Sequence, residues 1–285
     1  MLKLGASVTT KSRQHFNPLR FKNCIIWYDF LDKNFIYSDA GTTKIVENAK
    51  IYRIDNKAYI FQKNDTKAIG KYLENSDSNT QPRWKSPGYC YNDTTTFLKS
   101  TATVGNVSSN TLSDSTINYR AFTLFVVAEA RTANYTSADR IFGIYGPGNA
   151  DWLQLYVQGN TGHWRWGNNQ SIPKQGNEID SGIDVDQLNL SLITINSDSA
   201  SSNDVYVNGR TSSGVNNAAC VDHSADLSGN SNEVVYTGRV TGSDGFNGNI
   251  QEIIMYNGNI NRNERYEVEK YLMLKHGIGI HNSKD

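Results

Sequence analysis

The side chains best suited to holding a ligand lie on two neighbouring expected strands. In the run WLQLYVQ every second residue is aliphatic, which predicts a strand with one apolar face. Trp152 and Tyr156 then lie on the opposite, polar face. A Gly-Asn-Thr-Gly turn follows, and the expected partner strand then brings Trp164, Trp166 and Asn168 close by. Aromatic rings beside amides could bind carbohydrate, because rings pack on C–H groups while amides bond hydroxyls.

The same two tryptophans have a second interpretation. Trp164 and Trp166 share one face of their expected strand. They could therefore fill the core of a sandwich or pack on a neighbouring subunit, because tryptophan is usually well buried. The sequence favours burial slightly and leaves the sugar-binding interpretation open.

Several acidic residues could be considered as metal ligands. Asp180, Asp184 and Asp186 are close in sequence, and Asp244 lies in a glycine-flanked loop. Calcium takes six to eight oxygen ligands, and no local spacing supplies that number. Cys220–His223 holds zinc-type ligands without a second pair. We therefore expect no cofactor. Calcium is the metal that these acidic residues would suit, but their spacing does not support a site.

Charge is balanced over the 285 residues but is unevenly placed. A net charge of zero argues against a nucleic-acid-binding protein that depends on counterion release. A basic arm at residues 1–23 could dock on an acidic partner, although a solvated terminus is the alternative. Its candidate docking residues are Lys3, Lys11, Arg13, Arg20 and Lys22.

The beginning of the sequence has no apolar core of signal-peptide length, and no later stretch is apolar enough for a membrane span. Cys24, Cys90 and Cys220 are far apart and odd in number, which predicts reduced thiols. We therefore expect a protein made in the cytoplasm, without a membrane partner and without a disulfide.

Short alternating runs separated by polar turns predict an all-β chain from Cys24 onward. The polar stretch 74–119 is expected to form ordered loops. Ten or more strands followed by one helix predict an antiparallel two-sheet sandwich over residues 24–285. The expected strands include 24–28, 50–54, 58–61, 122–130, 141–145, 152–158, 163–167, 187–196, 205–207, 233–239 and 250–256.

The last strand and helix form the most legible unit. Residues 250–256 are rich in β-branched and aromatic residues, as in a strand. Asn261 and Glu264 have the spacing of a helix capping box, and Gly277 is a suitable helix stop. The sequence therefore predicts a helix over residues 262–276 with one apolar face.

Four motifs in this order carry a family resemblance: Trp27-Tyr28-Asp29, FTLFVVAEA, the YVNG turn at 206–209, and GNIQEIIMYN with its helix. Together they resemble concanavalin A-like, laminin-G-like jelly-roll domains of the kind found in tailed-bacteriophage virions. The resemblance covers about residues 24–280. It implies a jelly-roll sandwich that acts as a binding or structural module, without implying a substrate.

Some enzymes of this fold hydrolyse glucans with the carboxylates of a Glu-x-Asp-x-x-Glu strand. Retaining hydrolysis needs two carboxyl groups about 5–5.5 Å apart. The one candidate begins at Glu178 and Asp180, but Ile183 replaces the last acid. Gly182 and Pro173 also favour a loop there. We therefore expect no catalytic site.

The sequence favours a non-enzymatic virion protein, either a capsid decoration protein or a fibre-like surface protein. Its expected location is the virion surface. Its expected partners are other virion proteins, in a multi-copy or homo-oligomeric assembly, and host glycans. A glycan-active hydrolase and a cellular carbohydrate-binding module are the alternatives.

Overall fold

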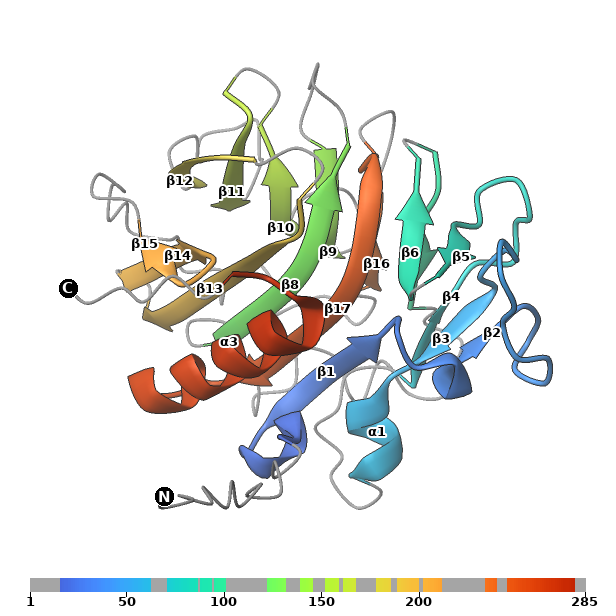
Figure 1. The fold of residues 1–285 in the computed structure, drawn as a ribbon, viewed down its shortest axis with the longest axis horizontal. Helices are drawn as coiled ribbons and strands as arrows, with labels where there is room; N and C mark the ends of the chain where they lie inside the picture. Colours follow the sequence, from blue (N-terminus) through green and yellow to red (C-terminus); the bar gives the residue numbers. More distant parts are fainter. Residues whose placement is uncertain are drawn as a thin grey trace, which may run out of the picture.

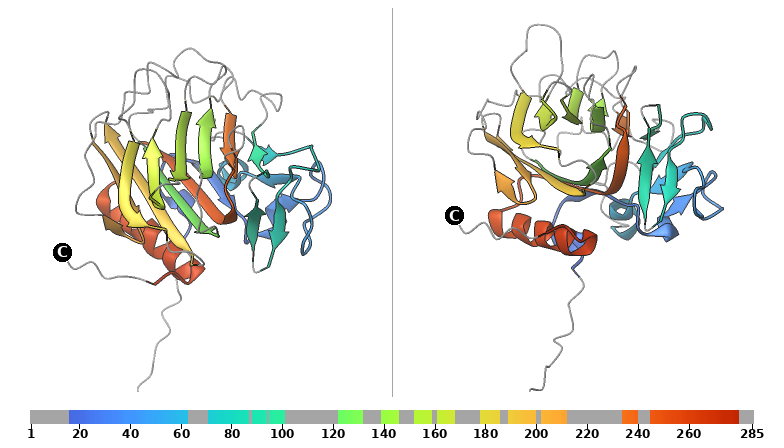
Figure 2. Two further views of the ribbon diagram at one scale, coloured as in Figure 1. Left: turned by 90° about the horizontal axis from the view of Figure 1, so that it is seen from above. Right: turned by 45° about the horizontal axis from the view of Figure 1, so that its top comes forward.

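Two antiparallel β-sheets pack face to face in the computed structural model, and helix α3 (Arg262–His276) lies outside one of them (Figures 1 and 2). The structure describes residues 16–62, 71–86, 88–93, 95–100, 122–131, 139–145, 152–158, 161–167, 178–185, 189–199, 202–211, 234–239 and 245–279. This architecture is the all-β sandwich with a C-terminal helix that the sequence predicts.

The first sheet, called here the β17 sheet, has the order β15-β14-β13-β8-β17-β6-β5, and β1 also pairs with β17. Its strands are β1 (Cys24–Asp29), β5 (Arg83–Lys85), β6 (Tyr89–Asn92), β8 (Phe122–Ala130), β13 (Ser191–Ser199), β14 (Ser202–Val207), β15 (Arg210–Thr211) and β17 (Gly248–Asn257).

The second sheet, called here the β10 sheet, has the order β12-β11-β10-β9-β16-β7-β4-β3-β2. Its strands are β2 (Ile36–Tyr37), β3 (Arg53–Asp55), β4 (Tyr72–Glu74), β7 (Leu98–Lys99), β9 (Asp139–Tyr145), β10 (Trp152–Val157), β11 (His163–Gly167), β12 (Glu178–Asp184) and β16 (Val234–Thr237). Short helices η1 (Pro18–Arg20), η2 (Lys33–Phe35) and α1 (Lys57–Phe61) complete the described elements before α3.

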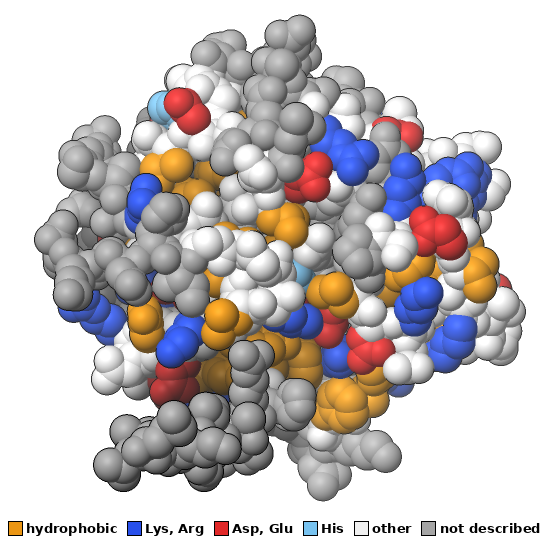
Figure 3. All heavy atoms as spheres, in the orientation of Figure 1, with side chains coloured by type: hydrophobic (Ala, Val, Ile, Leu, Met, Phe, Trp, Pro, Cys, Tyr) orange, Lys and Arg blue, Asp and Glu red, His pale blue; other side chains and the backbone are white. Residues whose placement is uncertain are grey.

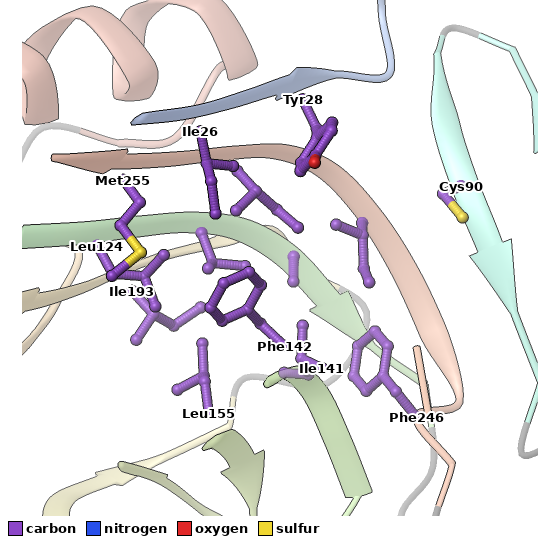
Figure 4. Packing of buried hydrophobic residues seen from close by; sticks show 14 of the residues in the cluster. Ile26, Tyr28, Cys90, Leu124, Ile141, Phe142, Leu155, Ile193, Phe246 and Met255 are labelled. Carbon is purple, nitrogen blue, oxygen red and sulfur yellow. The ribbon is translucent and has the colours of Figure 1, made fainter. Parts of the chain in front are cut away.

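The main core lies between the two sheets. Leu124 and Met255 of the β17 sheet point toward Phe142 and Leu155 of the β10 sheet (Figure 4), and all four are buried. Fully burying an apolar side chain of this size contributes roughly 1.5–3 kcal/mol. Alternation along each strand sends every second side chain to the opposite face of its sheet.

A second apolar layer covers the other face of the β17 sheet. Phe125 and Ile254 point away from the main core, where they join Val268 and Leu272 of α3 in one buried cluster. This explains why β8 reads as apolar on both faces, because both of its faces are covered. Figure 2 shows α3 on the side of the β17 sheet that is remote from β10, β11 and β12.

The ends of α3 follow the predicted capping chemistry. The Asn261 side chain accepts hydrogen bonds from the Asn263 and Glu264 amides, both at 3.0 Å. The Glu264 carboxylate accepts a bond from the Asn261 amide at 3.1 Å. Gly277 ends the helix at a φ of 69°, a left-handed conformation that suits glycine.

Residues 16–23, assigned by sequence to the arm, pack on the folded domain. Phe16 stacks on Tyr271 of α3 with ring centroids 4.7 Å apart, and Tyr256 donates its hydroxyl hydrogen to the Pro18 carbonyl at 2.9 Å. Pro18 is buried. This part of the predicted arm therefore belongs to the layer that covers the β17 sheet.

Three local expectations differ from the structure. Residues 58–61 form part of helix α1, because Asn56 caps it by accepting a bond from the Ala58 amide at 3.0 Å. Residues 178–184 form strand β12, where Gly182 takes a φ of 62° without ending the strand. The expected loops after residue 74 include strands β5, β6 and β7.

Candidate functional site

The aromatic residues proposed from sequence do not form an exposed platform. Tyr156, Trp164 and Trp166 are each 0% exposed. Trp164 and Trp166 belong to the main core. Side chains along β11 alternate between the two faces of the sheet, and these two lie on the face that packs against Phe122 and its neighbours. Burial was the alternative interpretation of these two tryptophans, and it is confirmed. The Trp152 side chain and Asn168 lie outside the described residues.

The opposite side of the same strands carries polar residues in register. Asp180, Arg165, Tyr156 and Arg140 are successive cross-strand partners on β12, β11, β10 and β9. Directly opposed residues lie on the same face of a sheet. These four side chains therefore form one row on the outer face of the β10 sheet, which we call the polar row.

The β11–β12 end of this row holds a partly exposed cluster of charged groups. His163 places Nδ1 at 2.9 Å from an Asp180 oxygen and Nε2 at 3.2 Å from an Asp184 oxygen. Arg165 Nη2 lies 2.7 Å from the second Asp180 oxygen. The Asp184 side chain is 87% exposed, whereas that of Asp180 is 36% exposed. We call these four residues the His163 cluster.

The electrostatics of this cluster hold Asp180 in its ionised form. Partial burial alone would raise the pKa of Asp180, but the Gly182 amide and the charges of Arg165 and His163 outweigh burial and lower the pKa below its ordinary value. The Gly182 amide donates to Asp180 at 2.8 Å. Asp180 is thus a hydrogen-bond acceptor whose position is fixed from three directions.

The middle of the outer face is closely packed and has a buried amide. Gln154 lies opposite Gly167 on one side and Gly143 on the other, and its side chain is fully buried. Arg140 Nε donates to Gln154 Oε1 at 2.7 Å, while Gln154 Nε2 has no hydrogen-bond partner among the residues that the structure describes. Glycine inside a strand often marks close approach by a ligand or another backbone.

A second cluster of charged groups lies beneath α3. Lys275 Nζ contacts Asp29 Oδ2 at 2.9 Å and Glu252 Oε2 at 2.6 Å, so the two carboxylates are close together. His276 Nε2 lies 2.7 Å from the same Glu252 oxygen, and Trp27 Nε1 donates to the other Glu252 oxygen at 2.9 Å. The side chains of Glu252 and His276 are fully buried.

This second cluster is a poor candidate for paired-carboxylate catalysis. A general acid must keep its proton near neutral pH, which requires a raised pKa. Burial alone would raise the pKa of Glu252, but the His276 hydrogen bond and the Lys275 charge outweigh burial and lower the pKa. The cluster therefore joins α3 to the β17 sheet through ionised groups.

Possible metal ligands do not gather in the described part of the chain. There, no group of three or more His, Cys, Asp or Glu side chains has a metal-binding arrangement. Cys24 and Cys90 are buried thiols that form no disulfide with each other. Asp186, Asp244 and Cys220–His223 lie outside the described residues. Among the helices of the described residues, none has the length and apolarity to cross a membrane.

The sequence did not predict that His163 and Arg165 would contact Asp180. Their partner Asp180 is 17 and 15 residues away, so only strand pairing brings them together. One signal was present: His163 and Arg165 alternate with Trp164 and Trp166 along β11. If the tryptophans are core residues, His163 and Arg165 must lie on the opposite face.

Comparison with known proteins identifies a fold. No protein-family model matches the sequence, and neither does any curated protein. Among solved structures, the chain is similar to Trypanosoma rangeli sialidase, with a TM-score of 0.51 and 15% identity over 92% of this chain and 34% of the sialidase. The chain thus spans about a third of that enzyme, and the likeness is one of fold.

Two further structures give lower scores. Domain 4 of AbnA, a GH43 extracellular arabinanase from Geobacillus stearothermophilus in complex with arabinotriose, has a TM-score of 0.48 and 14% identity over 87% of this chain and 98% of that domain. The CBM40 of Ruminococcus gnavus IT-sialidase, bound to alpha2,3 sialyllactose, has a TM-score of 0.43 and 16% identity over 53% of this chain and 83% of that chain.

Replacing Glu252 tests the cluster beneath α3. Glu252→Gln should lower the free energy of unfolding by about 3 kcal/mol at pH 7, because Lys275 and His276 lose a buried partner. The matched variant Glu267→Gln removes an exposed partner of Arg20 and should cost less than about 1 kcal/mol. Urea unfolding measures both values.

The pH dependence of the same pair has a defined sign. Because the pKa of Glu252 is lowered in the folded protein, its stabilisation is present above the ordinary glutamate pKa of about 4.3 and is lost as the pH falls further. The difference between wild type and Glu252→Gln should therefore shrink below pH 4. A difference that stays constant with pH would contradict an ionic role for Glu252.

A tryptophan substitution tests the burial of β11. Trp166→Ala should lower the free energy of unfolding by about 3–5 kcal/mol, since it empties a large volume in the core. Tyr266→Ala removes a ring that is 55% exposed on α3 and serves as the control. Urea unfolding followed by circular dichroism measures both. Equal, small losses would show that Trp166 is a surface ring.

Proposed function

We propose that the protein is a carbohydrate-binding β-sandwich and that its glycan site is the His163 cluster. The observation that carries the proposal is the set of planar polar groups at 2.7–3.2 Å from one another on adjacent strands of a sheet. Because a strand face is rigid, these side chains are already ordered before a ligand binds. Binding then costs little further conformational entropy.

The chemistry of the cluster suits sugar hydroxyls. A hydroxyl both donates and accepts hydrogen bonds, so it needs acceptors and donors side by side. Asp180 and Asp184 supply carboxyl oxygens as acceptors, and Arg165 and His163 supply N–H donors. Because Asp184 is largely exposed, a hydroxyl could replace its contact with His163 at little cost. Hydrogen bonds to charged groups contribute about 1.5–3 kcal/mol each.

We also propose that binding occurs without hydrolysis. A retaining glycosidase needs a protonated carboxylic acid as well as a nucleophile. The lowered pKa of Asp180 is the opposite of what a general acid requires. The proposal therefore rests on the ionised state of Asp180, one of the two acids in the catalytic candidate that the sequence analysis considered and did not favour.

The sequence resemblance to virion proteins supplies a proposed setting, the surface of a tailed-phage particle. Many copies displayed together would raise the avidity of weak sites without any new contact. A cellular carbohydrate-binding module fits the same cluster equally well. The arm residues Lys3, Lys11 and Arg13, proposed for particle docking, lie outside the described residues, while Arg20 pairs with Glu267 at 2.7 Å.

Glycan binding is tested on a glycan array, followed by calorimetry with the best glycan. Arg165→Ala should weaken binding about tenfold or more, because it removes a charged donor. Asp184→Ala should also weaken binding while leaving urea unfolding unchanged, since its side chain is exposed. Arg210→Ala, at an exposed position on β15, is the control. Wild-type affinity in both cluster variants would place the site elsewhere.

A reducing-sugar assay with the same glycan tests the absence of hydrolysis. We expect no product above the protein-free control over hours at pH 5 and pH 7. Product formation that Asp180→Asn abolishes would identify an enzyme and overturn the non-catalytic proposal.

A further inference from the structure

A polar groove lies beside the start of α3 and shares no lining residue with the His163 cluster. Two cavities of about 370 and 430 Å³ adjoin the turn between β17 and α3. Asn259 and Ile260 line both cavities, so the two are adjacent. We call the two cavities together the α3 groove. In Figure 1, α3 begins beside the arrowhead of β17, with the start of β1 close by.

The charges lining this groove are mainly positive. Its cations are Arg20, Lys22, Arg262 and Arg265, and its one acidic side chain is Glu264. The Glu264 carboxylate is already bonded to the amide that begins the helix. Elsewhere on this face, acidic and basic side chains are interspersed (Figure 3). An excess of one sign along a hollow favours ligands of the opposite sign.

Two of the four cations already have partners, and two are available. Arg20 pairs with Glu267 and Arg265 with Glu269, each at 2.7 Å. Lys22 and Arg262 are exposed, and no carboxylate among the described residues forms a salt bridge with either. The structure therefore leaves two positive charges, one on each side of the turn, for a ligand.

Amide side chains supply the remaining polar groups of the α3 groove. Five asparagines line it, which are Asn23, Asn196, Asn257, Asn259 and Asn261. An asparagine amide offers both a donor and an acceptor, as a peptide group does. The Asn261 side-chain oxygen already caps α3 and that of Asn196 accepts a bond from Thr123. An extended peptide could bond through its backbone to the side chains of Asn23 and Asn259, while its acidic side chains meet the cations.

The aromatic residues of the groove argue against a sugar as its occupant. Arg265 lies over the Tyr206 ring at 3.8 Å, and Arg20 lies over the Phe21 ring at 4.9 Å. These cations occupy ring faces on which a sugar would otherwise stack. Acidic side chains and peptide backbone fit the available groups better than a sugar ring does.

We propose that the α3 groove is a docking site for an acidic, extended segment of a partner protein. Arg20 and Lys22, which the sequence analysis names as candidate docking residues, line this groove. Helix α3 and strands β11 and β12, which carry the His163 cluster, lie on opposite sides of the β17 sheet (Figure 2). One copy can therefore dock on its partner and bind a glycan simultaneously.

The test uses the full chain and a fluorescein-labelled eight-residue peptide of alternating Glu and Gly. Fluorescence anisotropy at 50 mM salt should show saturable binding that weakens at 300 mM salt, because screening reduces attraction between exposed charges. Arg262→Glu and Lys22→Glu should each weaken binding about tenfold. Lys270→Glu makes the same charge change at an exposed position on α3 outside the groove, and should leave binding within about twofold.

Three results would overturn the proposal. They are equal binding of a matched peptide with Gln in place of Glu, equal loss of affinity in Lys270→Glu and Arg262→Glu, and tighter binding of an oligogalacturonate than of the peptide. The last result would identify an anionic sugar as the occupant. Urea unfolding of each variant confirms that it is folded. Glycan binding by the His163 cluster is measured separately, so the two proposals fail independently.

Discussion

The fold depends on strand β17, whose ten residues are all buried. β17 is buried on every side. It pairs with β8 along one edge and with β1 and β6 along the other, while the main core and α3 cover its two faces. Glu252 sits in the middle of this strand and needs compensating charge. Lys275 supplies it from the last turn of α3, where His276 also contacts the Glu252 carboxylate. Strand and helix are thus one structural unit.

This arrangement gives the two sides of the sandwich different chemistry. On the α3 side, charged groups are buried in ion pairs and rings are covered by packing, which favours stability. On the outer face of the β10 sheet, the His163 cluster is held in place yet partly exposed. A β-sandwich can present such a cluster because each inward core residue, such as Trp164 or Trp166, fixes an outward neighbour.

The sequence predicted the sandwich fold and the local features of α3 well, and the side-chain contacts between strands poorly. The capping of α3 by Asn261 and its stop at Gly277 were predictable, because each depends on residues within one turn. Residues 58–61 were predicted to form a strand but belong to helix α1. The Asn56 side chain caps this helix by accepting a bond from the Ala58 amide, which outweighs the β propensity of these residues. The site could not be assembled from sequence, because register alone places Asp180 opposite Arg165.

The central claim is that glycan recognition takes place on the His163 cluster. A crystal structure of the protein with a bound oligosaccharide tests it most directly. The account predicts sugar hydroxyls within hydrogen-bond distance of Arg165 and Asp180, with the Asp184 side chain contacting sugar or displaced from His163. A sugar bound on the α3 side of the sandwich, with the His163 cluster unchanged, would contradict it.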